Sequence, residues 1–316
     1  MRKVLVIGTG GTISCVETEN GLAPGRPVSE LIKDIELPVE IHTEQLFDLD
    51  STDMTPRHWE QLARRIRERY DEFDGFVVTH GTDTMAYGAA ALSVLIQNSR
   101  KPIVFTGSME AMTAENSDAP INLRDAINFA ADERPYGVFI MFCGEPLDGR
   151  RTHKNKTNSW QPFCTVNGCV NGYVDEVSNE IHYSDFEYLG ETSFYEHLSD
   201  DVFLAKLIPG QRLCVPENAR AVILEGYGAG GVPDYLLDDV AALANRGVYV
   251  IIGTQCEHGG TRLSEYEVGQ RAAKNFPILE TGSMSTEYSV AKAQWALAYS
   301  DNYEDFKRLF YSEVIL

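Results

Sequence analysis

The sequence is poor in basic residues and has no long hydrophobic run. Its 316 residues include 27 lysines and arginines against 47 aspartates and glutamates, which gives a formal net charge of -20. Proteins bind nucleic acids and anionic membrane surfaces through clusters of basic residues, so we expect this acidic chain to bind neither. No window approaches the ~20 apolar residues that a membrane span requires.

Cysteine is also scarce, and its six positions are scattered along the chain. Their spacing matches no zinc-binding pattern, and reduced thiols are typical of a cytosolic protein of this length. The chain begins with charged residues followed by only four apolar ones, whereas a secretory signal needs a run of about 7–15. We therefore predict a cytoplasmic protein with no structural disulfide and no metal. The six are Cys15, Cys143, Cys164, Cys169, Cys214 and Cys256.

The first part of the sequence alternates short apolar runs with stretches of helical spacing. Strands are predicted at 3–7, 39–42, 76–78, 101–107 and 136–142, and helices at 56–70, at 85–97 and from Pro120 onward. Thr55 is placed as an N-cap, with Pro56 as the first helical residue. Such alternation is typical of βαβ units and predicts an α/β fold with a mostly parallel sheet flanked by helices.

A second, smaller α/β domain is predicted in the last third of the chain. Strands are expected at 219–224 and 248–252, and helices at 235–245, 266–274 and 286–299. A length of 316 residues favours two domains over one. We predict an N-terminal domain at 1–190, a connector at 191–212 with one short strand near 202–204, and a C-terminal domain at 213–316.

Polar residues crowd the turns that follow three predicted strands. They lie at 9–12, at 51–53 and at 79–84, where five hydrogen-bonding side chains follow one strand. In a parallel sheet, ligands bind beyond the carboxyl ends of the strands. A dinucleotide fingerprint would need glycine in place of Ile13, and no Walker lysine follows. The turns are therefore either ordinary capped turns or a site where backbone and hydroxyl groups approach a ligand.

Two further segments bear on such a site. Residues 14–27 are polar, contain glycine and proline and have no helical or strand period, which predicts a mobile loop directly behind Thr12. Residues 148–157 form the one concentrated basic patch of the chain and include Lys154. Most basic runs are solvated surface. A lysine beside a carboxylate in a closed site instead holds charge or relays a proton.

The combination of motifs resembles the bacterial L-asparaginase family, and more closely its cytoplasmic type I branch. The matching segments lie in the same order and spacing, namely 9–13 (TGGTI), 51–54 (STDM), 80–85 (HGTDTM), 149–154 (GRRTHK), 117–120 (SDAP), 254–256 (TQC) and 284–287 (MSTE). They cover essentially the full length. The resemblance implies a two-domain asparaginase-like fold, and hydrolysis of L-asparagine to L-aspartate and ammonia without a cofactor.

The resemblance also implies roles for individual residues. Thr12 would be the attacking hydroxyl, while Lys154 would activate Thr82 or its water. Asp83 would hold the substrate's α-amino group and Ser51, with Thr52 beside it, its α-carboxylate. The backbone at Gly11 and Thr82 would form the oxyanion site. Active sites between subunits imply a homodimer or a homotetramer.

One position departs from the family pattern. A tyrosine that assists the first threonine is usually found about ten residues after it, and here that place is taken by Leu22. Leucine cannot relay a proton, so no tyrosine is predicted to be catalytic. Glu17, Glu19 and Tyr227 are the hypothetical substitutes.

Three alternative functions stay open at this point. A pocket discriminates glutamine from asparagine by only ~1–3 kcal/mol, so an amidohydrolase preferring glutamine is one of them. An amino-acid binding or sensor protein with weak or no catalysis is the second, and Leu22 favours it. An amidotransferase subunit acting on aminoacylated tRNA is the third, disfavoured by the acidic charge and by a start directly in the first strand.

Overall fold

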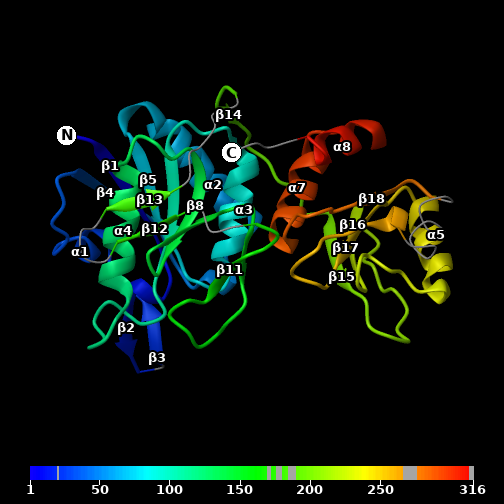
Figure 1. Ribbon diagram of the computed structural model, residues 1–316, viewed down its shortest axis with the longest axis horizontal. Coiled ribbons are helices and arrows are strands. Elements are labelled where there is room, and N and C mark those ends of the chain that lie inside the picture. The colour runs from blue at the N-terminus through cyan, green and yellow to red at the C-terminus, as the bar shows by residue number, and fades with distance from the viewer. Residues whose placement is uncertain (20, 169–171, 176–179, 184–189, 266–275, 313–316) are drawn as a thin grey trace. The chain divides into compact units, whose positions relative to one another are not determined.

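The computed structural model describes residues 1–19, 21–168, 172–175, 180–183, 190–265 and 276–312 (Figure 1). The chain divides into two compact units, one covering Met1–Glu196 and the other beginning at His197. Each unit has its own sheet. The α/β class expected from the sequence is confirmed in both.

The sheet of the first unit has six strands in the order β4-β1-β5-β7-β8-β9. Its members are β1 (Lys3–Gly10), β4 (Glu40–Leu49), β5 (Gly75–Thr79), β7 (Pro102–Thr106), β8 (Gly137–Phe142) and β9 (Glu145–Asp148). All neighbours are parallel except β8 and β9. The prediction of a mostly parallel sheet is therefore confirmed, and the apolar runs read as strands are its buried centre.

Helices cover both faces of this sheet (Figure 1). The helices are α1 (Val28–Leu31), α2 (Pro56–Arg69), α3 (Met85–Leu95) and α4 (Ala119–Ala131). Side chains alternate along a strand, so Val4 and Val6 share one face of β1 and pack with α1 and α4 in one apolar cluster. The other face is covered by α3, which contacts β7 and β8 and packs against α2. Helix α2 begins at Pro56 after Thr55, as predicted.

One expectation for the first unit is wrong, and one predicted strand is longer than expected. Residues 14–27 are not an irregular loop, because β2 (Cys15–Thr18) and β3 (Gly21–Pro24) pair as an antiparallel hairpin that projects from the unit (Figure 1). Most of its residues are exposed, so no burial pattern marked its strands in the sequence. Strand β4 is also far longer than residues 39–42, since it lies at the sheet edge, only partly buried, and can carry polar residues.

The second unit is built on four parallel strands in the order β15-β16-β17-β18. Its elements are β15 (Val202–Lys206), β16 (Ala221–Gly226), α5 (Leu237–Asn245), β17 (Tyr249–Thr254), β18 (Ile278–Glu280), α7 (Thr286–Ala298) and α8 (Tyr303–Phe310). The two predicted strands and the helix at 286–299 are confirmed, while β18 and α8 were not anticipated. The helix expected at 266–274 lies outside the described residues.

The segment expected to be a connector, residues 191–212, contains two strands, and one of them is the short strand expected near 202–204. Strand β14 (Ser193–Phe194) pairs with β6 (Ile96–Gln97) in the first unit, and β15 is the edge strand of the second sheet. The sequence pattern there is weak because both strands are only partly buried. Four other strands of the described residues pair two by two, β10 (Thr152–Lys154) with β11 (Phe163–Thr165) and β12 (Gly172–Val174) with β13 (Ile181–Tyr183).

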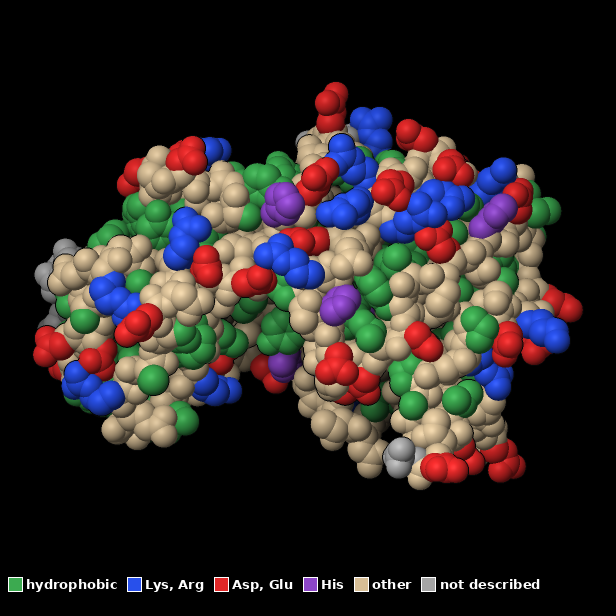
Figure 2. Space-filling model, turned by 180° about the vertical axis from the view of Figure 1, so that it is seen from behind, with side chains coloured by type: hydrophobic (Ala, Val, Ile, Leu, Met, Phe, Trp, Pro, Cys, Tyr) green, Lys and Arg blue, Asp and Glu red, His purple; other side chains and the backbone are tan. Residues whose placement is uncertain are grey.

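Charges on the surface are mixed in sign. On the face seen in Figure 2, Lys and Arg side chains are interspersed with Asp and Glu. The arginines of α2 illustrate this, because Arg65 contacts both Glu44 and Glu68, and Arg69 lies 3.0 Å from Glu72. Within the described residues, no helix is long and apolar enough to cross a membrane.

Candidate active site

Three polar turns lie side by side at the carboxyl edge of the first sheet. Strand β1 lies between β4 and β5, so the turn that follows it is flanked by the turns that follow its two neighbours. Thr12 stands in the middle turn, within the 3-10 helix η1 (Thr12–Ser14). Ser51 begins η2 (Ser51–Asp53) after β4, and Thr82 lies between β5 and α3. The strand order therefore brings together residues that are 30 to 70 positions apart, as the sheet-edge argument predicted.

Two glycines allow these turns to touch. A Cβ atom on Gly11 would lie 2.3 Å from the backbone nitrogen of Gly81, and Gly11 has a φ of +81°. A Cβ atom on Gly81 would lie 2.5 Å from the hydroxyl oxygen of Ser51. The Gly11 N–H also donates to the Leu49 carbonyl at 2.9 Å. Because any other residue would clash, the glycines fix the spacing of all three turns.

Lys154 reaches the Thr82 turn from β10. Its ammonium group donates to the Thr82 hydroxyl at 2.8 Å and to the Asp83 carboxylate at 2.6 Å. The side chains of Lys154 and Asp83 are 14% and 58% exposed, so the lysine is enclosed while the carboxylate stays open to solvent. The structure thus brings together three of the predicted site residues, and the basic run around Lys154 is not merely solvated surface.

Ser51 and Thr52 have different surroundings. Ser51 is buried, and its backbone carbonyl accepts a hydrogen bond from the Thr84 hydroxyl at 2.7 Å. Thr52 is exposed, and its N–H and hydroxyl both donate to Asp50 at 2.8 Å. These hydrogen bonds hold the pKa of Asp50 below its usual value, and the bond from the Thr52 backbone N–H has the larger effect. Asp50 was missed in the sequence, although an aspartate two residues before a turn threonine is a common turn signal.

The hydroxyl of Thr12 makes no hydrogen bond to any described residue. The Thr12 side chain is half-buried and lies three residues before the first strand of the β2–β3 hairpin. Leu22 and Glu17 are opposite each other in the hairpin register, and both are exposed. Glu19 is exposed as well, and Tyr227 belongs to the second unit.

His80 is a buried polar residue that sequence reasoning gave no role. It is fully buried between β5 and the Thr82 turn, and its Nδ1 atom lies 2.7 Å from the Gly81 carbonyl oxygen. Burial lowers the pKa of His80 to about 4, so its ring is neutral at physiological pH. A single histidine next to an apolar run is typical of a packed core, which is why the sequence alone did not single it out.

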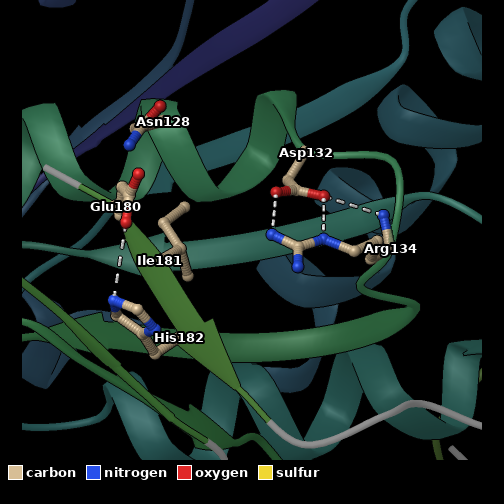
Figure 3. A pocket seen from close by; sticks show the side chains of 6 residues that line it. All are labelled: Asn128, Asp132, Arg134, Glu180, Ile181 and His182. Carbon is tan, nitrogen blue, oxygen red and sulfur yellow. Dashed lines mark hydrogen bonds and ion pairs between the residues drawn. The ribbon is translucent and has the colours of Figure 1, made fainter.

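Figure 3 shows one pocket of the first unit. It is lined by Asn128, Asp132, Arg134, Glu180, Ile181 and His182. Arg2, which precedes β1, donates to the carbonyl of Asp132, so the pocket is at the amino edge of the sheet. Its charged side chains face one another, with Arg134 2.8 Å from Asp132. In the described parts of the chain, no group of three or more His, Cys, Asp or Glu side chains could hold a metal ion.

The sequence matches two family models in succession. Residues 3–186 match the model described as Asparaginase, N-terminal, and residues 206–310 match the Glutaminase/Asparaginase C-terminal domain. The L-asparaginase of Thermococcus kodakarensis is 36% identical over 97% of this chain and 96% of its own length. A glutamyl-tRNA(Gln) amidotransferase component from Thermofilum pendens is 30% identical, and the match covers 98% of this chain and 73% of that protein.

Solved structures agree with the sequence matches. The structure of the thermostable L-asparaginase from Thermococcus kodakarensis superimposes with a TM-score of 0.91 at 35% identity, covering 99% of this chain and 98% of the other. L-asparaginase I from Vibrio cholerae gives a TM-score of 0.87 at 26% identity, covering 99% and 97% of the two chains. The predicted asparaginase-like fold is thereby confirmed.

Proposed function

Because the chain belongs to the asparaginase family, matched by both of its domain models, we propose that it hydrolyses the side-chain amide of L-asparagine to L-aspartate and ammonia. One observation carries the proposal. The Lys154 ammonium group lies within hydrogen-bond distance of both Thr82 and Asp83, in the turn that touches the Thr12 turn through Gly11 and Gly81. Two threonine hydroxyls, a lysine and a carboxylate therefore meet at one sheet edge.

We assign nucleophilic attack to Thr12. Its hydroxyl oxygen forms a bond to the amide carbon of the substrate while the hydroxyl proton leaves to a base. The carbon–nitrogen bond then breaks, and the amide nitrogen takes up a proton and departs as ammonia. Water hydrolyses the resulting ester and releases aspartate. The absence of a hydrogen bond from the Thr12 hydroxyl to any described residue supports this role, because the group is available to a substrate.

Lys154 and Thr82 form the second part of the machinery. A hydroxyl is a weak nucleophile and needs a partner that moves its proton. The 2.8 Å contact between Lys154 Nζ and Thr82 Oγ1 allows the amine of Lys154 to take the proton of the hydroxyl, or of a water held by it. Positioned proton transfer contributes typically ~10²–10⁴-fold to a rate. The backbone N–H of Thr82 is assigned to the oxyanion, where such a donor contributes roughly 3–4 kcal/mol. The N–H of Gly11, expected to share this role, instead donates to the Leu49 carbonyl at 2.9 Å.

The charged ends of the substrate require two opposite kinds of partner. Asp83 supplies the anionic one for the α-amino group, and its 58% exposure leaves it open to a ligand. Ser51, with Thr52 beside it, supplies donors for the α-carboxylate. Thr52 is exposed beside Ser51. Its hydroxyl can therefore bind the substrate carboxylate after it releases Asp50.

A coupled ammonia assay tests the proposal. Wild type and Thr12→Ala are compared on L-asparagine, D-asparagine and L-glutamine, with Thr43→Ala as a control because Thr43 lies in β4, before its carboxyl end. We expect ammonia release from L-asparagine that is lost in Thr12→Ala and kept in Thr43→Ala. Faster release from L-glutamine would reassign the substrate. A rise in melting temperature with asparagine but no ammonia from any amide would identify a binding protein instead.

We further propose that the enzyme is cytoplasmic and works as a homodimer or a homotetramer. The support is the resemblance of its motifs to the type I branch of the family, whose active sites lie between subunits. Light scattering coupled to size exclusion measures the mass of the particle. A monomeric particle with full activity would contradict the shared-site proposal.

A further inference from the structure

We infer that His80 is a positioning residue that aims the backbone N–H of Thr82 at the oxygen of the scissile amide. The inference rests on the proposed function and deepens it. It starts from the bond between His80 Nδ1 and the carbonyl oxygen of Gly81, which is 2.7 Å long. A carbonyl oxygen only accepts, so the Nδ1 atom carries the proton and the neutral ring is in a single tautomer.

The hydrogen bond sets the orientation of one peptide group. The peptide that joins Gly81 to Thr82 is planar and trans, so its C=O and its N–H point in opposite directions. With the carbonyl held against the buried ring of His80, the N–H of Thr82 points away from the core. Among the described residues, this N–H has no hydrogen-bond acceptor. It is therefore available to a ligand in the turn that also contains the Thr82 hydroxyl.

The imidazole ring cannot easily release the carbonyl, because it is fixed on several sides. Its ring packs edge-on against Phe105, with 5.7 Å between the ring centroids. The backbone of His80 is tied to the next strand, since its N–H donates to the Thr106 carbonyl at 2.8 Å. Just beyond the end of the same strand, β7, a Cβ atom on Gly107 would lie only 2.3 Å from the His80 carbonyl oxygen. Contacts in the core of the sheet therefore fix His80, and the hydrogen bond from His80 in turn fixes the peptide between Gly81 and Thr82.

The second ring nitrogen of His80 makes no hydrogen bond with the described residues that would explain a histidine in the core. Its Nε2 atom is buried and has no hydrogen-bond partner among the described residues. It faces Gly88 of α3, where an added Cβ atom would lie 3.5 Å away. The Nδ1 bond to Gly81 is therefore the contact that favours histidine at this position.

Two substitutions separate positioning from packing. In His80→Leu the donor is lost while the volume is nearly kept. In His80→Asn the side-chain amide can place an N–H near the former Nδ1 atom, although packing against Phe105 is poorer. We expect His80→Leu to lower kcat on L-asparagine about tenfold or more, with KM changed less than twofold. His80→Asn should recover at least half of the lost activity. His42→Leu, at a half-exposed histidine of β4, serves as the control for removing an imidazole.

Melting temperatures of all variants are measured together with the kinetics. A packing role and a positioning role predict opposite rankings of His80→Leu and His80→Asn by activity. If packing mattered, His80→Asn would be both the less stable and the less active variant. Positioning predicts that His80→Asn is the less stable but the more active one. Equal kcat for wild type and His80→Leu would overturn the inference and leave the proposed function intact. A wild type that releases no ammonia would overturn the proposed function, and the inference with it.

Discussion

The ammonium nitrogen of Lys154 lies 2.8 Å from the hydroxyl oxygen of Thr82, although 72 positions separate the two residues in the chain. The lysine comes from a short hairpin strand and the threonine from the turn after a central strand of the sheet. The same ammonium group also contacts Asp83, so the neighbouring threonine and carboxylate share one cation. This arrangement supports a proton-transfer role for Lys154.

Replacing Lys154 by methionine is expected to lower kcat on L-asparagine by about 10²–10⁴-fold, the range typical of a lost proton-transfer group. Lys154→Arg should also be impaired, because a guanidinium group stays charged and cannot take up a proton. Steady-state kinetics with an ammonia readout measures both. Lys156→Met is the matched control, since Lys156 is two residues further on and exposed. Equal losses in both methionine variants would count against a specific role for Lys154.

Gly11→Ala is expected to destabilise the first unit by more than about 3 kcal/mol and to abolish activity. The new methyl group would lie 2.3 Å from the Gly81 nitrogen and push the two threonine turns apart. Gly21→Ala is the control, because Gly21 also has a positive φ, of +110°, but no atom lies within 4 Å of its added Cβ. Denaturant unfolding measures both. If the two variants lose similar stability, backbone strain rather than the contact between turns determines the effect.

Leu22→Tyr is expected to raise kcat on L-asparagine severalfold. The family resemblance places a proton-relaying tyrosine at this position, and the hairpin exposes 59% of the Leu22 side chain, so a larger residue fits. Ala23→Tyr is the control, since successive residues of a strand point to opposite faces of the hairpin. Activity that rises equally in both variants, or in neither, would contradict the assignment of position 22.

The same hairpin allows a test of the residue that assists Thr12 in the wild type. Glu17 is opposite Leu22 in the register and on the same face, so it is the best-placed carboxylate of the hairpin. If Glu17 takes the role of the absent tyrosine, Glu17→Gln should lower kcat while Glu19→Gln leaves it unchanged. A Glu17→Gln variant with the wild-type rate would exclude Glu17 as the base.

His80 is expected to make the protein sensitive to acid. Burial lowers the pKa of His80 to about 4, against an ordinary value of 6.5, so between these limits the unfolded chain binds a proton that the folded chain does not. Stability therefore falls as the pH drops from about 6.5 to 4, by about 3 kcal/mol across that window from this group. Urea unfolding of wild type and His80→Leu at pH 7 and pH 4.5 measures the difference. A similar loss of stability in both proteins would show that His80 titrates normally.

Much of the first unit could be predicted from the sequence, for physical reasons. Strands such as 76–78 are buried on both sides, so they appear as continuous apolar runs that end abruptly in polar turns. The edge strand β4 and the β2–β3 hairpin are partly exposed, so burial imposed no pattern on them. His80 was overlooked for the complementary reason, because a buried side chain reveals its hydrogen bond only when the backbone around it is known.

By itself, the sequence determined the α/β class, the existence of polar turns at strand ends, and the family motifs that contain Thr12, Thr82 and Lys154. These follow from local burial and from residue identity. Only the tertiary structure decided that Lys154 contacts Thr82, that Gly11 and Gly81 bring the turns into contact, and that His80 orients the peptide before Thr82. Such contacts depend on the order of strands in the sheet, which joins segments that are far apart in the chain and leaves no mark in any one of them.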